Sequence, residues 1–228
     1  RKSNGYDYGR KVYRALRSVL DADSAMLDIG AGPGSFVIPF AEHIKFVTAV
    51  EPSHEMANLL RENAAEAGID NYALIEEIMQ DLPIGGELDA AFDLVTVSLV
   101  FWMYEDVWPL ISQMETYSNK YCAIVAEIPD HKNPRSASCC DVEEFQILYN
   151  MLAAQGRFAN VRTIDYRCER SIEDELRYRL LAYEQYEGDV TDAVREELHR
   201  AVCAEAKNGK CTVATRSAVI WWDVREML

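Results

Sequence analysis

The sequence lacks any apolar run of the roughly 18 residues that a membrane-spanning helix needs. It also lacks a Cys-x-x-Cys pair, although it contains six cysteines, and no signal peptide precedes them. A chain of 228 residues buries enough surface to fold without disulfides, so we expect these thiols to stay reduced. These absences predict a cytoplasmic protein with no membrane partner.

Basic residues are scarce. The chain has 23 Lys and Arg against 38 Asp and Glu, which gives a net charge of -15. Nucleic-acid binding depends on Lys and Arg displacing counterions from phosphates, so we expect no nucleic-acid partner. Length and an ordinary hydrophobic content of 49% predict one domain over residues 1–228. Within it we expect a leading helix in 1–21 and a helical insertion over 171–209, and the sequence leaves the oligomeric state open.

The rest of the chain is organised around residues 25–53. A short apolar run, Ala25 to Ile29, is followed by three glycines spaced as Gly-x-Gly-x-Gly and then by apolar residues at helical spacing. A second apolar run, Phe46 to Val50, ends at Glu51. This pattern predicts a strand, a glycine turn, a helix and a second strand with an acid at its tip.

Glycines at the start of a helix let a ligand approach the backbone, because no Cβ holds it away. Glu51 follows the first glycine by about 20 residues, where a carboxylate can accept hydrogen bonds from both hydroxyls of a ribose. The pattern therefore favours a nucleotide-like ligand. The alternative is a turn that only needs positive φ angles.

The glycine spacing separates two ligand classes. Dinucleotide-binding folds use Gly-x-Gly-x-x-Gly, whereas here the third glycine comes one residue early. The stretch LDIGAGPGSF resembles the first motif of the class I S-adenosylmethionine-dependent methyltransferases, and the resemblance covers roughly residues 25–127. It implies an α/β, Rossmann-like, doubly wound sheet of seven strands in the order 3-2-1-4-5-7-6. The last strand would be antiparallel, with the helical cap inserted before it.

The resemblance also implies S-adenosyl-L-methionine as the cofactor and assigns binding residues. Those around the amino acid end of the cofactor are Asp28, Gly30, Ala31, Gly32 and Gly34. Those near the ribose are Glu51, Pro52 and Ser53; those flanking the adenine are Glu77, Ile78 and Met79; and those bordering the site at the end of the fourth strand are Ser98 and Leu99. Many family members carry an acid where this chain has Ile78, which is a departure. Tyr6 and Tyr8 in the leading helix are further candidates for lining the site.

Hydrophobic periodicity predicts the remaining elements. The expected strands are Asn71–Ile75, Phe92–Ser98, Tyr121–Ala126, Val161–Tyr166 and Thr212–Trp222. The expected helices are Asn4–Leu20, one capped by Ser53 and ended by Gly68, Tyr104–Ser118, one from Asp141 to Gly156, and two within Ser171–Gly209 joined near Gly188.

Methyl transfer to a hydroxyl or a protonated amine needs a base, and His131 is the natural candidate, assisted by Glu127 or Asp130. The alternative is that these residues belong to a solvated loop. The pair Cys139-Cys140 has no supportive metal-ligand spacing, so we expect no metal. No Asn-Pro-Pro-Tyr element follows the fourth strand, which disfavours methylation of amino groups on bases.

The sequence therefore predicts a methyltransferase, a transferase acting on a small-molecule acceptor. Acids and aromatic side chains in the cap favour a neutral or cationic acceptor. Two alternatives stay open at this point, an NAD(P)-dependent oxidoreductase and a non-catalytic sensor that binds the cofactor.

Overall fold

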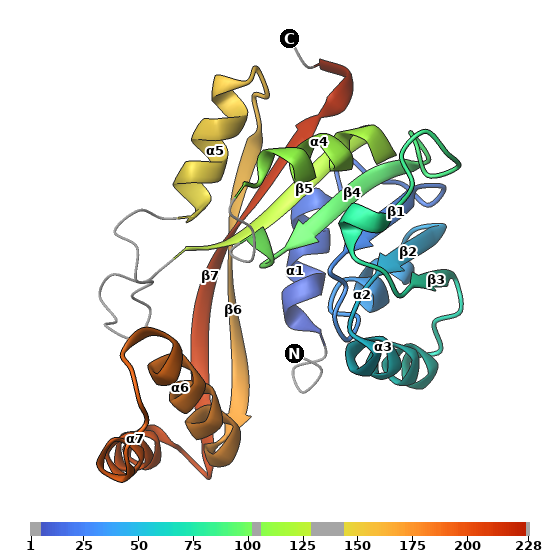
Figure 1. Ribbon diagram of the computed structural model, residues 1–228. Coiled ribbons are helices and arrows are strands. Elements are labelled where there is room, and N and C mark those ends of the chain that lie inside the picture. The colour runs from blue at the N-terminus through green and yellow to red at the C-terminus, as the bar shows by residue number, and fades with distance from the viewer. Residues whose placement is uncertain (1–5, 102–105, 129–143, 227–228) are drawn as a thin grey trace.

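Seven strands form one mixed sheet in the order β3-β2-β1-β4-β5-β7-β6 (Figure 1). The computed structural model describes residues 6–101, 106–128 and 144–226. The strands are β1 (Ala25–Ile29), β2 (Phe46–Val50), β3 (Tyr72–Ile75), β4 (Phe92–Ser98), β5 (Ser118–Ile128), β6 (Asn160–Ser171) and β7 (Lys210–Asp223). The first five are mutually parallel, and β7 is antiparallel to both β5 and β6. The predicted fold class and sheet order are confirmed.

Helices cover both faces of the sheet, as a parallel sheet requires. They are α1 (Asp7–Leu16), α2 (Val37–Ala41), α3 (His54–Ala67), α4 (Trp108–Tyr117), α5 (Glu144–Ala154), α6 (Ile172–Tyr186) and α7 (Asp192–Glu205). Successive strand residues alternate between the two cores: Met26 packs with α1 and α2, while Leu27 packs with α4 and α5. The same alternation places Asp28 on the α1 face of the sheet, which becomes the face of the site.

Some boundaries differ from the predicted ones. Helix α1 ends at Leu16 instead of Leu20, because the polar segment after it forms its own turn, in which Asp21 Oδ1 accepts from Asp23 N and from Ser24 Oγ. Helix α4 begins at Trp108, one residue before Pro109, which is favoured in a first helical turn. Strands β6 and β7 are both longer than their apolar cores suggested.

Helix α3 follows its predicted signals at both ends. The Ser53 hydroxyl accepts a hydrogen bond from Met56 N at 3.4 Å, and Gly68 ends the helix with a φ of 68°. The Ser53 cap fixes the chain just beyond the tip of β2. This keeps Glu51 at the carboxyl edge of the sheet, where open α/β sheets bind their ligands.

Strands β6 and β7 extend beyond β5 as a two-stranded ribbon. The last register pair of β5 is Ile128 with Arg216, whereas β6 and β7 stay paired as far as Ser171 and Lys210. Helices α6 and α7 lie at the far end of this ribbon (Figure 1) and form the insertion before the last strand. Cys211 Sγ donates to Val202 O of α7, and Cys211 shares its face of β7 with Ser217 and the α1 core. The insertion therefore lies on the α1 side, beyond the carboxyl edge.

An ion-pair network holds the insertion together. Glu175 of α6 is 4% exposed and accepts from Arg170 Nη1 of β6 at 2.9 Å and from Arg179 Nε at 2.8 Å. Arg179 in turn donates to Glu205 of α7 at 2.7 Å. These charge-assisted bonds tie both helices to the ribbon, so α6 has a defined position relative to the sheet.

Candidate active site

The glycine turn folds back over the end of β2. Gly30 N and Ala31 N both donate to Val50 O, at 2.9 and 3.0 Å. All three glycines have positive φ angles. A Cβ on Gly30 would lie 2.9 Å from Val100 Cγ1, and one on Gly34 would lie 3.3 Å from Ile38 and Leu60, so a larger residue at either position would push against a neighbouring side chain, in addition to the strain of the positive φ.

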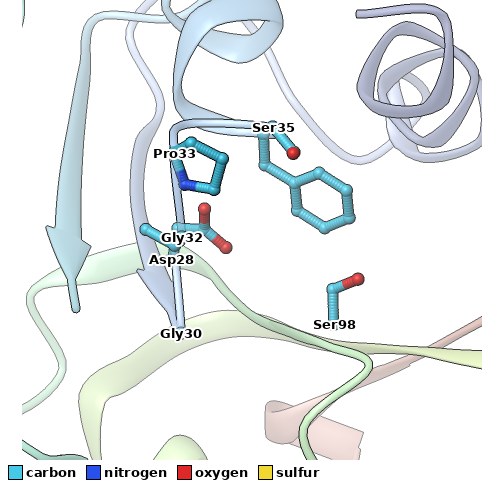
Figure 2. Close-up of a pocket in the computed structure, with 8 residues that line it drawn as sticks. Asp28, Gly30, Gly32, Pro33, Ser35 and Ser98 are labelled. Carbon is cyan, nitrogen blue, oxygen red and sulfur yellow. The ribbon is translucent and has the colours of Figure 1, made fainter. Parts of the chain in front are cut away.

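Gly32 is different, because an added Cβ there would have no atom within 4 Å. The space beside this backbone is open, and Gly32 is one of the residues that line a small pocket that opens to solvent. The lining residues are Asp28, Gly30, Ala31, Gly32, Pro33, Ser35, Phe36 and Ser98 (Figure 2). A ligand in this pocket would rest directly on peptide groups.

Asp28 supplies the acidic group of the pocket. Asp28 is 2% exposed, and its Oδ1 accepts a hydrogen bond from Thr96 Oγ1 at 3.0 Å. Burial raises the pKa of Asp28 to about 7; the hydrogen bond from Thr96 opposes this rise, and the charge of Glu51 adds to it. A cationic ligand group beside Asp28 would favour the ionised form and restore a low pKa.

Glu51 lies at the tip of β2, behind the glycine turn. Its side chain accepts from Gly32 N at 2.8 Å through Oε2 and from Ser53 N at 2.9 Å through Oε1. Each carboxylate oxygen has a second lone pair, so both retain acceptor capacity for ribose hydroxyls. Glu51 therefore fixes the conformation of the turn. It is 7% exposed and is not one of the residues that line the pocket, so its contact with a ribose stays a prediction. Pro52, between Glu51 and Ser53, is exposed.

The three residues predicted to flank the adenine do not form one surface. Glu77 is exposed, and the Ile78 side chain is 44% exposed at the carboxyl end of β3. Met79 is 4% exposed, packs in the core on the α4 side and accepts from Gln113 Nε2 through its carbonyl. Of the three, Ile78 is therefore the side chain that offers an uncovered apolar surface, at the position where many family members have an acid.

The end of β4 joins the pocket to the leading helix. Ser98 lines the pocket, and its Oγ lies 2.6 Å from the Tyr8 hydroxyl of α1. Leu99 has a φ of 58°, an uncommon conformation for a branched side chain, and it turns the chain sharply at the carboxyl edge. Tyr8 is 2% exposed and lies behind Ser98, whereas Tyr6 begins α1 in a left-handed conformation.

Of the predicted catalytic pair, Glu127 and His131, the structure describes only Glu127. His131 lies outside the described residues, as do Asp130, Cys139 and Cys140. Glu127 lies near the end of β5, exposed and opposite Ser217, on the same face of the sheet as Val125 and the α1 core. That is the face of the pocket, although Glu127 is not one of its lining residues.

Sequence reasoning missed three lining residues, Pro33, Ser35 and Phe36. All three lie within the motif LDIGAGPGSF, so the motif itself marked this segment as part of the site. In the described ranges, no three His, Cys, Asp or Glu side chains gather closely enough to hold a metal ion. Every helix of these ranges is too short or too polar to cross a bilayer.

Comparison with known proteins agrees with this geometry. A family model described as "Methyltransferase domain" matches residues 26–118, which contain the glycine turn, Glu51 and β4. A segment of 86 residues is 28% identical to the uncharacterized methyltransferase YcgJ of Bacillus subtilis. This segment covers 38% of the present chain and about a third, 33%, of that relative's length.

Solved structures extend the likeness over nearly the whole chain. The YcgJ structure from Bacillus subtilis has a TM-score of 0.58 at 15% identity, covering 93% of this chain and 97% of that one. A precorrin-6y C5,15-methyltransferase from Geobacter metallireducens gives 0.54 at 15% identity, covering 94% and 86%. The tRNA (m1A58) methyltransferase TrmI from Aquifex aeolicus gives 0.56 at 11% identity, covering 94% and 68%. At such identities the likeness shows the fold and leaves the acceptor open. Motif, family match and sheet order agree: residues 26–118 match a methyltransferase domain, and the fold is similar to that of the class I S-adenosylmethionine-dependent methyltransferases.

Proposed function

We propose that this protein transfers a methyl group from S-adenosylmethionine to a small-molecule acceptor. The observation that carries the proposal is the pocket built on bare glycine backbone, with the buried carboxyl of Asp28 on one side of Gly32 and that of Glu51 hydrogen-bonded to Gly32 N. Anionic groups suit the ammonium and the ribose hydroxyls of this cofactor. A dinucleotide would instead bring a pyrophosphate, which two buried acids would repel.

The residues present fit the cofactor in three places. Asp28 would hold the ammonium, the peptide groups around Gly32 would face the amino acid end, and Glu51 would accept hydrogen bonds from the ribose. Ile78, exposed at the neighbouring strand tip, would cover part of the adenine by apolar contact. When bound, the cofactor supplies an activated methyl group and a neutral leaving group, so the protein contributes position and electrostatics.

Three features support a small acceptor that carries no phosphate. The net charge of -15 would repel polyanions, and the insertion contributes further acids beyond the carboxyl edge. The insertion also lies on the pocket side of the sheet, where it would narrow access for a macromolecule.

Glu127 is the described residue that we propose as a base, with His131 as its predicted partner. The cytoplasmic location stays a prediction.

An acceptor panel with a radiolabelled methyl donor tests this proposal. We expect neutral or cationic small molecules to be methylated faster than sugar phosphates, nucleotides or tRNA, because the site and its surroundings are acidic. Glu127→Gln and His131→Ala should lower turnover of a hydroxyl or amine acceptor by about 10²-fold or more, the usual contribution of a general base. Preferred methylation of tRNA or of a phosphorylated acceptor would contradict the small-molecule proposal. Cofactor binding without transfer to any extract component would favour the sensor alternative.

A further inference from the structure

An imidazole and a thiol face each other on the surface of the insertion. His199 and Cys203 lie four positions apart on α7, so their side chains are neighbours on one face of the helix. Both residues are exposed, and Cys203 Sγ lies 3.6 Å from His199 Nε2 and 4.0 Å from Nδ1. We call these two residues the α7 pair. The proposed methyl transfer uses neither of them.

The geometry of the α7 pair matches that of two ligands on one zinc ion. Imidazole nitrogen and thiolate sulfur are common protein ligands of Zn²⁺ and hold it in tetrahedral geometry. With a Zn–S distance of about 2.3 Å and a Zn–N distance of about 2.0 Å, a tetrahedral angle separates sulfur from nitrogen by about 3.5 Å. The observed 3.6 Å is close to that separation. Because both side chains are exposed, they can turn toward a shared ion without disturbing the core.

One chain supplies only half of such a site. Structural zinc sites have four protein ligands, whereas in the described ranges no third His, Cys, Asp or Glu joins the α7 pair in a group that could hold a metal. A second copy of the chain carries the same two ligands. A twofold axis through the ion would complete a Cys₂His₂ set, because a twofold contact brings the same surface of both copies together.

The position and charge of α7 suit contact with a second copy. Figure 1 shows this helix at the far end of the β6–β7 ribbon, away from β1 and β4, which border the pocket. Asp192 and Glu196 share the face of the α7 pair, because they precede it at helical spacing, and the exposed Lys207 follows the helix. In an antiparallel contact centred on the α7 pair, the acids of one copy lie toward Lys207 of the other, so opposite charges meet.

We propose that His199 and Cys203 of two chains bind one zinc ion, and that this shared ion joins the chains through α7. The proposal goes beyond the proposed methyl transfer and does not depend on it. It differs from the expectation of no metal, which was drawn from Cys139 and Cys140. The ion binds thiolate and neutral imidazole, so the association releases protons and weakens as the pH falls.

Mass measurements with and without zinc test the proposal. The full chain is treated with a chelator, freed of it, and titrated with zinc chloride in the presence of a phosphine reductant, and light scattering after size exclusion gives its mass. We expect the mass to double from its zinc-free value, to saturate at one zinc ion per two chains, and to return when chelator is added. Because the phosphine keeps thiols reduced, a disulfide between chains cannot give this result.

Variants at the two ligands should lose the effect. His199→Ala and Cys203→Ser should each abolish the doubling, and both replace exposed side chains, so folding should be unaffected. His54→Ala is the control for another exposed histidine, which pairs with Glu76 beside α3, and it should keep the full doubling. Cobalt in place of zinc should give the thiolate-to-metal absorption of a tetrahedral site in the wild type, and Cys203→Ser should lose it.

Three results would overturn the proposal. A mass that zinc leaves unchanged would mean that the α7 pair is a thiol–imidazole contact only. Saturation at one zinc ion per chain would mean that the ion is held within one copy. Doubling that persists in His199→Ala or Cys203→Ser would place the ion elsewhere. Binding of S-adenosylhomocysteine, measured separately, should be the same with and without zinc, so failure here is distinguishable from failure of the proposed function.

Discussion

The affinity for S-adenosylhomocysteine should rise about tenfold between pH 6 and pH 8, and Asp28→Asn should abolish this rise. With a pKa of about 7 in the free protein, Asp28 is mostly protonated at pH 6 and mostly ionised at pH 8. An ammonium group binds the ionised form, so the ligand binds more tightly as the pH rises, and below pH 7 binding releases a proton. Titration in buffers of different ionisation enthalpy measures that proton directly.

The same group gives the ligand-free protein a pH-dependent stability of opposite sign. Because burial raises the pKa of Asp28 from 3.8, the folded state binds the extra proton between pH 4 and pH 7. The free energy of unfolding should therefore fall as the pH rises from 4 to 7, by an amount on the order of a few kcal/mol. Above pH 7 the ionisation of Asp28 should change it little. Asp28→Asn should remove this pH dependence of stability. It should also lower the affinity for S-adenosylhomocysteine roughly 10- to 100-fold at pH 8, because a hydrogen bond to a charged group is lost. An unchanged affinity at pH 8 would show that Asp28 does not contact the ligand.

Gly32→Ala should reduce the affinity for S-adenosylhomocysteine by roughly 10- to 100-fold, because the new methyl group enters space that the ligand needs. Urea unfolding should show a small separate loss of about 1 kcal/mol, since the φ of 54° at this position disfavours any Cβ. The two effects are separable because nothing lies within 4 Å of the added atom in the ligand-free protein.

Gly85→Ala is a matched control for Gly32→Ala. Gly85 also has a positive φ, of 83°, and open space around its added Cβ, but it lies in the loop before β4 and does not line the pocket. It should lose similar stability and keep full affinity. Equal loss of affinity in both variants would mean that Gly32 acts through the fold and does not border the ligand.

Local signals in the sequence predicted the glycine turn after β1 and both ends of α3 well. Each glycine of the turn has the positive φ that its residue type suggested, Ser53 caps α3, and Gly68 ends it. Asp93, at the start of β4, accepts from Ala25 N of the neighbouring strand at 2.7 Å and pairs with Lys120. These features depend on residues close in sequence or on neighbouring strands whose order the motif implied.

Features that depend on contacts between distant parts of the chain could not be predicted from local sequence patterns. The contact of Tyr8 with Ser98 joins a helix and a strand that have no common pattern, and nothing in periodicity distinguishes Tyr8 from Tyr6 or Tyr13. Met79 looked like an adenine contact but packs in the core beside α4, because the short turn Met79–Asp81 directs it inward. The side of the sheet occupied by α6 and α7 follows from the register of β6 with β7, which apolar runs do not reveal.

The most direct test of the account is a calorimetric titration of the wild-type protein with S-adenosylhomocysteine and, separately, with NAD. The account predicts saturable binding of one S-adenosylhomocysteine per chain, lost or weakened in Gly32→Ala and kept in Gly85→Ala, with no heat from NAD. Binding of NAD in place of S-adenosylhomocysteine would contradict the claim that the pocket beside Gly32 and Glu51 holds a sulfonium nucleoside.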